Sequence, residues 1–303
     1  FPELQGIMGG KYLKYEGFNE DVCLAVAEHY LPSFYKDSLP STKYGAIISI
    51  ADKIETLISI FITGKRPSGS SDPYALRRNL NGVIKIIWDY ELDFPLYNLF
   101  EEVIDFWKIS FPNLDFSKEK VLNDLSEFLV QRTVSHLEEI SMSKELIKAV
   151  GSLDKIYQKR IINIVDLKNR IESIIYFQKK TTFVEILKLI TRVSKLANKS
   201  NLSKEVLSTG DYIDTKIFEK DCELKAFEFI KDLEKNFSTD YCDYVKLLHL
   251  FEINTNKIED LFDNDKGVLV MTDDIKIRNN RLNLLSLIRN YSLKIADFTL
   301  FSS

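Results

Sequence analysis

Glycine and proline are scarce in this sequence, and their scarcity constrains the fold more than any other feature. The 303 residues include only 11 glycines and 7 prolines, so the glycine share is about half the usual one. Sandwiches, barrels and Rossmann folds use both residues in many tight turns. The shortage therefore predicts an all-α fold, in which long helices are joined by few connections.

Helical periodicity supports this assignment. Apolar residues in 41–61 recur at three- and four-residue spacing, which predicts one buried face: Tyr44, Ile47, Ile48, Ala51, Ile54, Ile58 and Phe61. Ser41 is the expected N-cap of this helix. A second helix is expected to begin at Asp72 and Pro73 and to run towards Trp88. In the last long helix, residues 277–300, the side chains expected to point inward are Leu282, Leu285, Ile288, Ile295 and Phe298.

Charge is distributed very unevenly along the chain. The formal net charge is −4, yet residues 144–204 contain 14 Lys and Arg against 5 Asp and Glu, and residues 205–275 contain 8 against 18. A basic middle can hold a polyanion such as RNA without making the whole chain basic. Tyr157, Tyr176 and Phe177 lie near lysines and could stack on unpaired bases, although such residues more often belong to a core.

Cysteine and histidine are too few and too scattered to predict a metal site. Cys23, Cys222 and Cys242 have no C-x-x-C spacing, and the three histidines are far apart in the sequence. Zinc needs about four converging N or S ligands, so we expect three buried or idle thiols in a reducing cytoplasm. The sequence predicts no transmembrane helix and no signal peptide. Since it begins with Phe1 and not methionine, we expect it to be part of a longer protein.

One carboxylate is a candidate for metal chemistry. Asp52, in an Ala-Asp-Lys segment, resembles the last metal-binding element of HD-type phosphohydrolases. That site also needs an earlier histidine and a His-Asp pair, and His29 is the only histidine before Asp52. One histidine and one aspartate do not rebuild the site, so we expect a structural or surface role for Asp52.

The C-terminal helix carries a second group of candidates. Arg278, Asn280 and Arg281 open this helix, and Arg289 follows two turns later. Guanidinium and amide groups can bind phosphates and base edges. The structural alternative is that Asn279 or Asn280 caps the helix, while Arg281 pairs with Asp273 or Asp274. Both roles are compatible.

Eight segments carry a family resemblance and lie in colinear order along almost the whole chain: FPELQGIMGGKY (1–12), EHYLP (28–32), DSLPST (37–42), IADKIETLISIF (50–61), SDPYALRRNLNGVIKII (71–87), FLVQR (128–132), ITRVSKLANK (190–199) and LFDNDKGVLVMTDDIKIRNNRLNLLSLIRNYSLKIADFTLF (261–301). Together they resemble one family, the β subunit of the heterotetrameric bacterial glycyl-tRNA synthetase.

The resemblance implies a domain order and a division of labour. Residues 1–112 are expected to form an HD-like helical domain with an incomplete metal motif, 113–200 a basic helical body, and 201–303 an anticodon-binding domain. The holoenzyme, an α2β2 assembly, uses ATP and magnesium to attach glycine to tRNA(Gly). Its catalytic core lies in the α subunit, so no catalytic residue, metal or cofactor is expected in this chain. It would act in the cytoplasm, with no membrane partner.

Residue by residue, the resemblance makes nine side chains candidates for tRNA contact. Those in the anticodon-binding part are Arg278, Asn280, Arg281 and Arg289. Those in the HD-like part and the body are Lys65, Arg66, Arg77, Arg78 and Arg192. We therefore expect a non-catalytic fragment that binds tRNA(Gly) and positions it for glycylation. The alternatives are a residual HD-type metal-dependent phosphohydrolase and a helical scaffold that mainly docks the α subunit.

Overall fold

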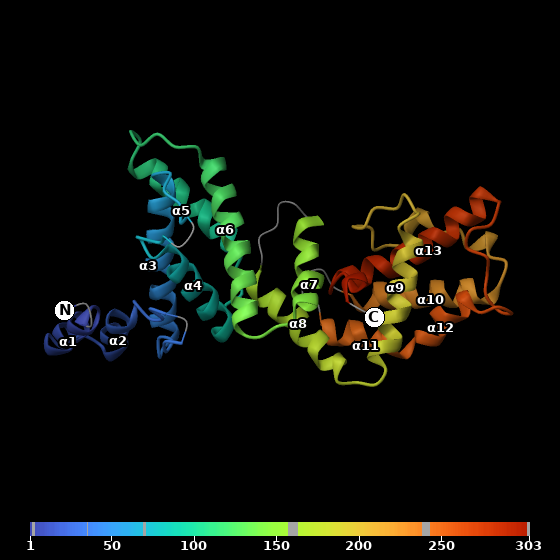
Figure 1. Ribbon diagram of the computed structural model, residues 1–303, viewed down its shortest axis with the longest axis horizontal. Helices are drawn as coiled ribbons and strands as arrows, with labels where there is room; N and C mark the ends of the chain where they lie inside the picture. Colours follow the sequence, from blue (N-terminus) through green and yellow to red (C-terminus); the bar gives the residue numbers. More distant parts are fainter. Residues whose placement is uncertain (2–3, 35, 69–70, 157–162, 238–242, 302–303) are drawn as a thin grey trace. The chain divides into compact units, whose positions relative to one another are not determined.

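The computed structural model describes residues 1, 4–34, 36–68, 71–156, 163–237 and 243–301; side chains are described except in 152–156. In this part of the chain every regular element is a helix and there is no strand, which confirms the all-α class (Figure 1). The chain forms two compact units, Phe1–Met142 with Lys159–Lys168 and Ser143–Gln158 with Asn169–Ser303. The three domains expected from the family resemblance, 1–112, 113–200 and 201–303, stay a prediction. The two units are defined by packing within the structure, which does not test the domain boundaries. None of the described helices is long and apolar enough to cross a membrane.

The first unit is built around one long helix. Its helices are α1 (Ile7–Tyr15), α2 (Glu20–Glu28), α3 (Lys43–Ile62), α4 (Leu76–Tyr90), α5 (Leu96–Ser110) and α6 (Lys118–Glu139). Helix α3 packs on α2, α4, α5 and α6. Ile54, Leu57, Ile58 and Phe61 are buried in the core of this unit, so the second half of α3 buries the face that its spacing predicts.

The first half of α3 departs from the expected buried face. Tyr44, Ile47 and Ile48 are 64%, 54% and 47% exposed, and Ala51 is exposed too. The face that packs is rotated by about one residue and contains Ala46, Ser49, Ile50 and Lys53. Apolar side chains at the same spacing thus lie on two adjacent faces, and periodicity alone does not say which one packs.

The expected caps of α3 and α4 are wrong in position. Thr42, not Ser41, is the N-cap of α3 and accepts a hydrogen bond from the Gly45 N–H at 3.0 Å. Helix α4 begins at Leu76, after Ala75 in the left-handed conformation with φ 56°. Asp72 still acts as a cap, because its carboxylate accepts from the N–H groups of Leu76 and Arg77 at 2.8 and 3.0 Å. It does so from outside the helix.

The second unit surrounds the C-terminal helix. Its helices include α7 (Lys144–Ile156), most of α8 (Ile164–Gln178), α9 (Phe183–Ala197), α10 (Asp221–Asn236), α11 (Tyr244–Ile253), α12 (Thr255–Glu259) and α13 (Ile275–Leu293). Helix α13 packs against α9 and α10. Leu282, Leu285, Ile288, Ile295 and Phe298 are all at most 4% exposed, which confirms their expected inward orientation. The helix, expected to run to residue 300, ends at Leu293, so Ile295 and Phe298 lie beyond it.

Candidate nucleic-acid interface

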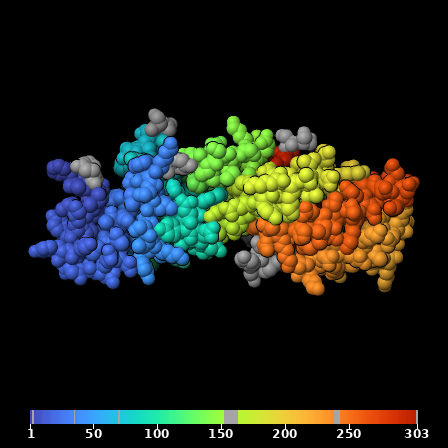
Figure 2. Space-filling view, turned by 90° about the horizontal axis from the view of Figure 1, so that it is seen from below, coloured from blue at the N-terminus to red at the C-terminus, as the bar shows by residue number. Residues whose placement is uncertain are grey.

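Helix α9 presents a row of exposed basic side chains in the second unit. Lys188, Arg192, Lys195 and Lys199 follow one another at spacings of four, three and four residues, and all four are exposed. Such spacing places them along one side of the helix and its C-terminal extension. The opposite side, with Phe183, Ile186, Ile190 and Val193, is buried. Helix α9 lies within the yellow part of the surface in Figure 2, which also includes the segments next to it in the sequence.

The α9 basic row has few acidic neighbours. No ion pair joins any of its four residues to an acidic group in the part of the chain that the structure describes. The Arg192 guanidinium lies 4.2 Å from the centroid of the Phe262 ring, which fixes its position without neutralising its charge. Glu185, one turn before Lys188, is the acidic residue on this side of α9. Four solvated cations at a helical spacing suit a row of phosphates.

The aromatic pairs near lysines divide between core and surface. Phe177 is fully buried, whereas Tyr176 is 53% exposed. The Lys180 ammonium lies 4.2 and 5.4 Å from the two ring centroids and pairs with Glu252 at 2.8 Å. Hydrogen bonds from Lys180 and Thr182 lower the pKa of Glu252 to about 2. Tyr157, by contrast, lies outside the described residues.

Arg281 is held inside the second unit by carboxylates. It is 4% exposed, and its Nε donates to Oε1 of the fully buried Glu223 at 2.8 Å. Its Nη2 lies 2.5 Å from Glu219 Oε2, and its Nη1 donates to the Leu269 carbonyl at 3.1 Å. The expected pairing with Asp273 or Asp274 is wrong, because Glu223 of α10 and Glu219, just before that helix, bind the guanidinium, and Asp274 caps α13.

Arg289 and Asn280 are also engaged within the protein. Arg289 is 3% exposed and donates to the carbonyl of Ala197 at 2.9 Å and to Asn290 Oδ1 at 2.9 Å. Burial lowers its pKa. Asn280 does not cap α13; its amide exchanges two hydrogen bonds with the backbone of Asp214. Arg278 is half-buried and makes one bond, to the Thr272 carbonyl at 3.2 Å.

The candidates of the first unit differ in exposure. Arg66 stacks on the Phe61 ring at 4.0 Å and pairs with Asp124. Lys65 is exposed and donates to the Tyr74 hydroxyl at 2.5 Å. Arg77 is half-buried with a marginal 3.5 Å contact to the Ser71 carbonyl. Arg78 is exposed on α4, with no polar partner among the residues that the structure describes. Arg78 is therefore the candidate of this unit that is most available to a ligand.

Known proteins match this chain along nearly its whole length. The sequence profile described as "Glycyl-tRNA synthetase beta subunit" matches residues 1–152. The chain belongs to the glycyl-tRNA synthetase β subunit family. The protein named "Glycine--tRNA ligase beta subunit" from Trichodesmium erythraeum (strain IMS101) is 37% identical over 303 residues, with 98% of this chain and 42% of that protein aligned. Its namesake from Clostridioides difficile (strain 630) is 33% identical, with 99% and 41% aligned. The chain thus spans about two fifths of the length of these relatives.

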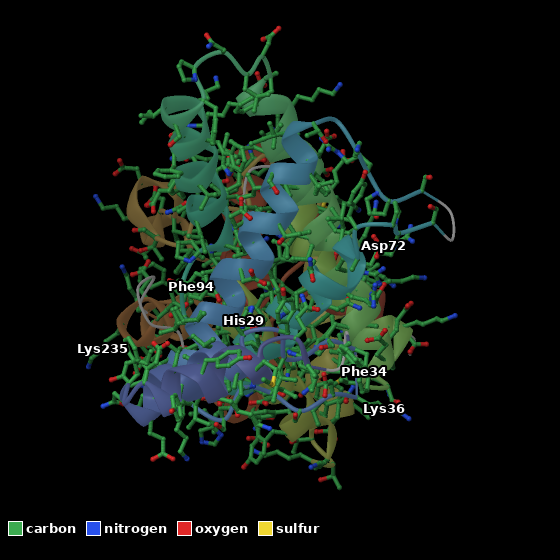
Figure 3. All side chains as sticks on the ribbon, turned by 90° about the vertical axis from the view of Figure 1, so that its left-hand side faces the viewer. His29, Phe34, Lys36, Asp72, Phe94 and Lys235 are labelled. Atoms are coloured by element: carbon green, nitrogen blue, oxygen red, sulfur yellow. The ribbon has the colours of Figure 1, made fainter. Side chains whose placement is uncertain are left out.

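The described side chains do not support the phosphohydrolase alternative. No three His, Cys, Asp or Glu side chains of the described residues gather as a metal site would require. Asp52 is exposed on α3. The His29 ring, labelled in Figure 3, donates from Nδ1 to the Val26 carbonyl at 2.7 Å.

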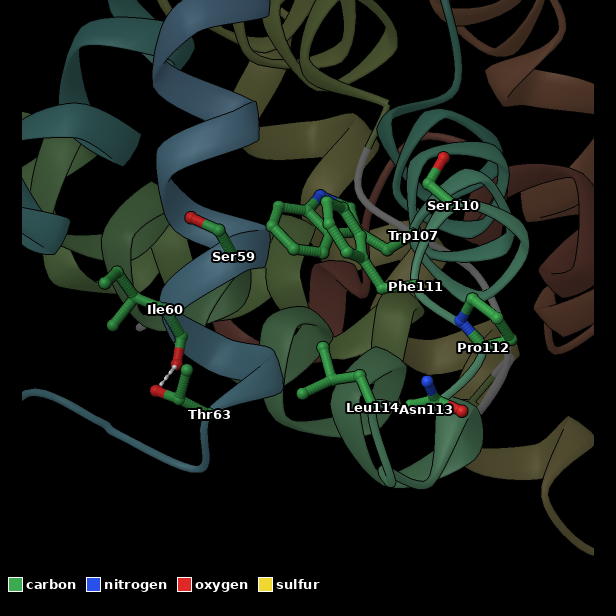
Figure 4. Close-up of a pocket in the computed structure, with 9 residues that line it drawn as sticks. All are labelled: Ser59, Ile60, Thr63, Trp107, Ser110, Phe111, Pro112, Asn113 and Leu114. Carbon is green, nitrogen blue, oxygen red and sulfur yellow. Dashed lines mark hydrogen bonds between the residues drawn. The ribbon is translucent and has the colours of Figure 1, made fainter.

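A pocket of about 670 Å³ lies between the C-terminal ends of α3 and α5 (Figure 4). Trp107 and Phe111 stack in its wall with ring centroids 4.8 Å apart. Its other lining residues are Ser59, Ile60, Thr63, Ser110, Pro112, Asn113 and Leu114. Since none of the lining side chains is ionisable, the pocket suits an apolar group and offers no acid or base for catalysis.

His136 provides a pH prediction for the first unit. It is 3% exposed, its Nε2 has no partner among the described residues, and burial lowers its pKa to about 4. The pKa of His136 is about 6.5 in the unfolded chain, so the unfolded state takes up a proton before the folded state does. The stability that the neutral ring contributes above pH 6.5 is therefore lost as the pH falls to 4. We expect a loss of roughly 3 kcal/mol in the free energy of unfolding.

Chemical denaturation at pH 7 and pH 4 checks this result, with His136→Leu as the comparison. Leucine fills a similar volume and removes the titrating group without removing a hydrogen bond. The variant is expected to lose less stability than the original protein over this pH range, and identical losses would contradict the prediction.

Proposed function

We propose that this chain binds tRNA(Gly) and positions it for ATP- and magnesium-dependent glycylation by a separate α subunit in an α2β2 synthetase. The observation that carries the proposal is the family match, together with relatives named as glycine–tRNA ligase β subunits over the whole of this chain. In this proposal the chain contributes no catalytic residue. Its place of action is the cytoplasm, where aminoacylation supplies protein synthesis.

The α9 basic row supports RNA binding in the second unit. Each lysine or arginine that neutralises a phosphate releases condensed counterions, and this release drives association at low salt. The row lies in the basic middle of the chain and includes Arg192, a candidate from the sequence. We assign the phosphate contacts of this unit to Lys188, Arg192, Lys195 and Lys199, together with the half-buried Arg278.

The buried candidates have an indirect role in this proposal. Asn280, Arg281 and Arg289 hold α13 to its surroundings, and their polar groups are occupied. They would support the anticodon-binding part by keeping its surface in place. In the first unit, the exposed Lys65 and Arg78 and the half-buried Arg77 are assigned to the body of the tRNA.

Charge removal on α9 tests the proposal. In the full-length protein, the double variant Arg192→Gln, Lys195→Gln is expected to bind tRNA(Gly) about tenfold more weakly, and the log–log salt slope should fall by about two. Fluorescence anisotropy titrations at several salt concentrations measure both quantities. Lys235→Gln, an exposed lysine on α10 in the same unit, is the matched control (Figure 3).

Two outcomes would contradict the proposal. One is an absence of tRNA binding at low salt, and the other is equal affinity of the double variant and the Lys235→Gln control.

Docking of the α subunit is a second candidate function, because Tyr44, Ile47 and Ile48 form an exposed apolar strip on α3. Binding of α subunit without tRNA, lost in Ile47→Asp, would favour that function.

A further inference from the structure

Arg132 lies on the side of α6 that packs against the rest of the first unit. The Phe128 ring lies 5.5 Å from the Phe61 ring of α3, and the His136 ring lies 5.4 Å from the Trp88 ring of α4. Arg132 stands between Phe128 and His136 at four-residue spacing, which places the three side chains on one side of the helix. Arg132 therefore faces the region where α6 meets α3 and α4.

The Arg132 guanidinium makes no hydrogen bond or ion pair with any residue that the structure describes. Its Nε is buried without an acceptor, whereas the side chain as a whole is half-buried and Nη1 and Nη2 are not enclosed. A guanidinium stays charged at any ordinary pH and carries five N–H donors. An unpaired charged group is costly when it is withdrawn from water, so an anion that reaches Nη1 and Nη2 would remove part of that cost.

Arg77, in the first turn of α4, is a second cation beside Arg132. Burial is the main reason why the pKa of Arg132 is lowered; the charge of Arg77 lowers it further, whereas Glu139 and Asp72 raise it. Arg77 is half-buried, and its one contact is from Nη1 to the Ser71 carbonyl at a marginal 3.5 Å. Two guanidinium groups with unused donors thus lie near each other.

The two nearby carboxylates do not occupy these donors. Asp72, labelled in Figure 3, caps α4, because its Oδ1 and Oδ2 accept from the N–H groups of Leu76 and Arg77 at 2.8 and 3.0 Å. Glu139 is exposed at the end of α6 and forms no ion pair within the described part of the chain. Residues 64–85 contain five Lys and Arg against one Asp, so the surroundings favour an anion.

We propose that Arg77 and Arg132 form a clamp for one phosphate of the tRNA backbone. The planar donors of a guanidinium match phosphate oxygens, and a shared anion offsets the repulsion between the two cations. A backbone phosphate carries no base identity, so the clamp positions the tRNA without reading its sequence. The inference rests on the proposed binding of tRNA and adds Arg132, which is not among the sequence candidates, as a phosphate ligand.

Arg132→Met tests the clamp in the full-length protein. Methionine keeps the apolar contacts of the side-chain stem and removes a charge without a partner, so the midpoint of urea unfolding is expected to stay the same or rise. The affinity for tRNA(Gly) should fall about tenfold, as when hydrogen bonds to a charged group are lost, and the log–log salt slope should fall by about one. Fluorescence anisotropy titrations at several salt concentrations measure both. A lower unfolding midpoint with unchanged affinity would show a purely structural role and overturn the clamp.

A double variant tests whether the two arginines share one phosphate. Arg77→Gln alone is expected to weaken tRNA binding as Arg132→Met does. If both side chains hold the same phosphate, the double variant loses less affinity than the product of the two single losses. Single losses that multiply would place the arginines on separate phosphates and overturn the clamp.

Lys120→Gln is the matched control, because Lys120 is an exposed cation on the same helix with no partner among the described residues. It should leave the affinity nearly unchanged. ATP is the other phosphate ligand of the proposed reaction, and a loss of ATP binding in Arg132→Met would assign the clamp to a nucleotide and overturn the proposal. Equal tRNA affinity of Arg132→Met and Lys120→Gln overturns the clamp and leaves the proposed function standing, whereas absence of tRNA binding to the original protein removes both.

Discussion

Replacing Arg281 by alanine is expected to destabilise the second unit by about 3–5 kcal/mol, the usual result of removing one partner of a buried ion pair. The change leaves the carboxylate of Glu223, which is fully buried, without its guanidinium. Glu223 also accepts hydrogen bonds from the N–H groups of Glu219 and Lys220 at 2.8 and 3.0 Å. Its carboxylate therefore connects the start of α10 to α13, and urea unfolding of the variant measures the loss.

A double variant separates packing from RNA contact. Arg281→Met with Glu223→Gln removes both charges together and keeps an amide oxygen that can accept from the N–H groups of Glu219 and Lys220. We expect it to recover part of the lost stability, because neither member of the buried pair is then left as an unpaired charge. If Arg281→Ala kept full stability and lost only tRNA affinity, a direct RNA contact would explain it and the structural role would be wrong.

Replacing Arg289 by alanine is expected to cost about 3 kcal/mol, for a different reason. Its guanidinium has no carboxylate partner within the described residues and donates to the carbonyls of Ala197 and Leu202 and to Asn290 Oδ1. Alanine leaves the Leu202 carbonyl and Asn290 Oδ1 without this donor, each at about 1–3 kcal/mol before relaxation. The Ala197 carbonyl keeps the Ser200 N–H at 3.0 Å. Denaturant unfolding gives the total loss.

Hydrogen exchange locates the damage. We expect faster exchange in the segment after α9, where Leu202 loses its donor. Arg278→Ala on the same helix is the control, since Arg278 is half-buried with one bond at 3.2 Å, and it should cost less than 1 kcal/mol. Similar losses in the free energy of unfolding for Arg289→Ala and Arg278→Ala would contradict the prediction that the buried hydrogen bonds of Arg289 stabilise this unit.

The sequence predicts the helices better than it predicts their environment. Spacing identifies the inward face of α13 correctly, because α9 and α10 pack on that helix and Leu282, Leu285 and Ile288 are buried, although Ile275 at its start is 63% exposed. It fails for the first half of α3, where two adjacent faces are apolar and only one is covered. Helices α1, α2 and α5 are not among the predicted helices, although Asn19 caps α2 and Pro95 directly precedes α5.

The candidate site shows the same limit. An arginine is recognisable in a sequence, but its partners are not: Glu223 lies 58 positions before Arg281, and only packing brings them together. The α9 basic row could be predicted from the sequence, because its four residues lie at helical spacing. Arg77 and Arg132 belong to separate helices, and no local pattern links them.

The segment from Leu202 to Asp214 is held in place by side chains of α13 that bond to its main chain. Asn290 donates to the carbonyls of Ser203 and Val206, Tyr291 to that of Leu207, and Asn283 to that of Tyr212. These bonds end on peptide groups, which every amino acid supplies equally. Substitutions at the exposed positions of this segment should therefore be tolerated more readily than substitutions of Asn283, Asn290 and Tyr291, whose side chains make the bonds.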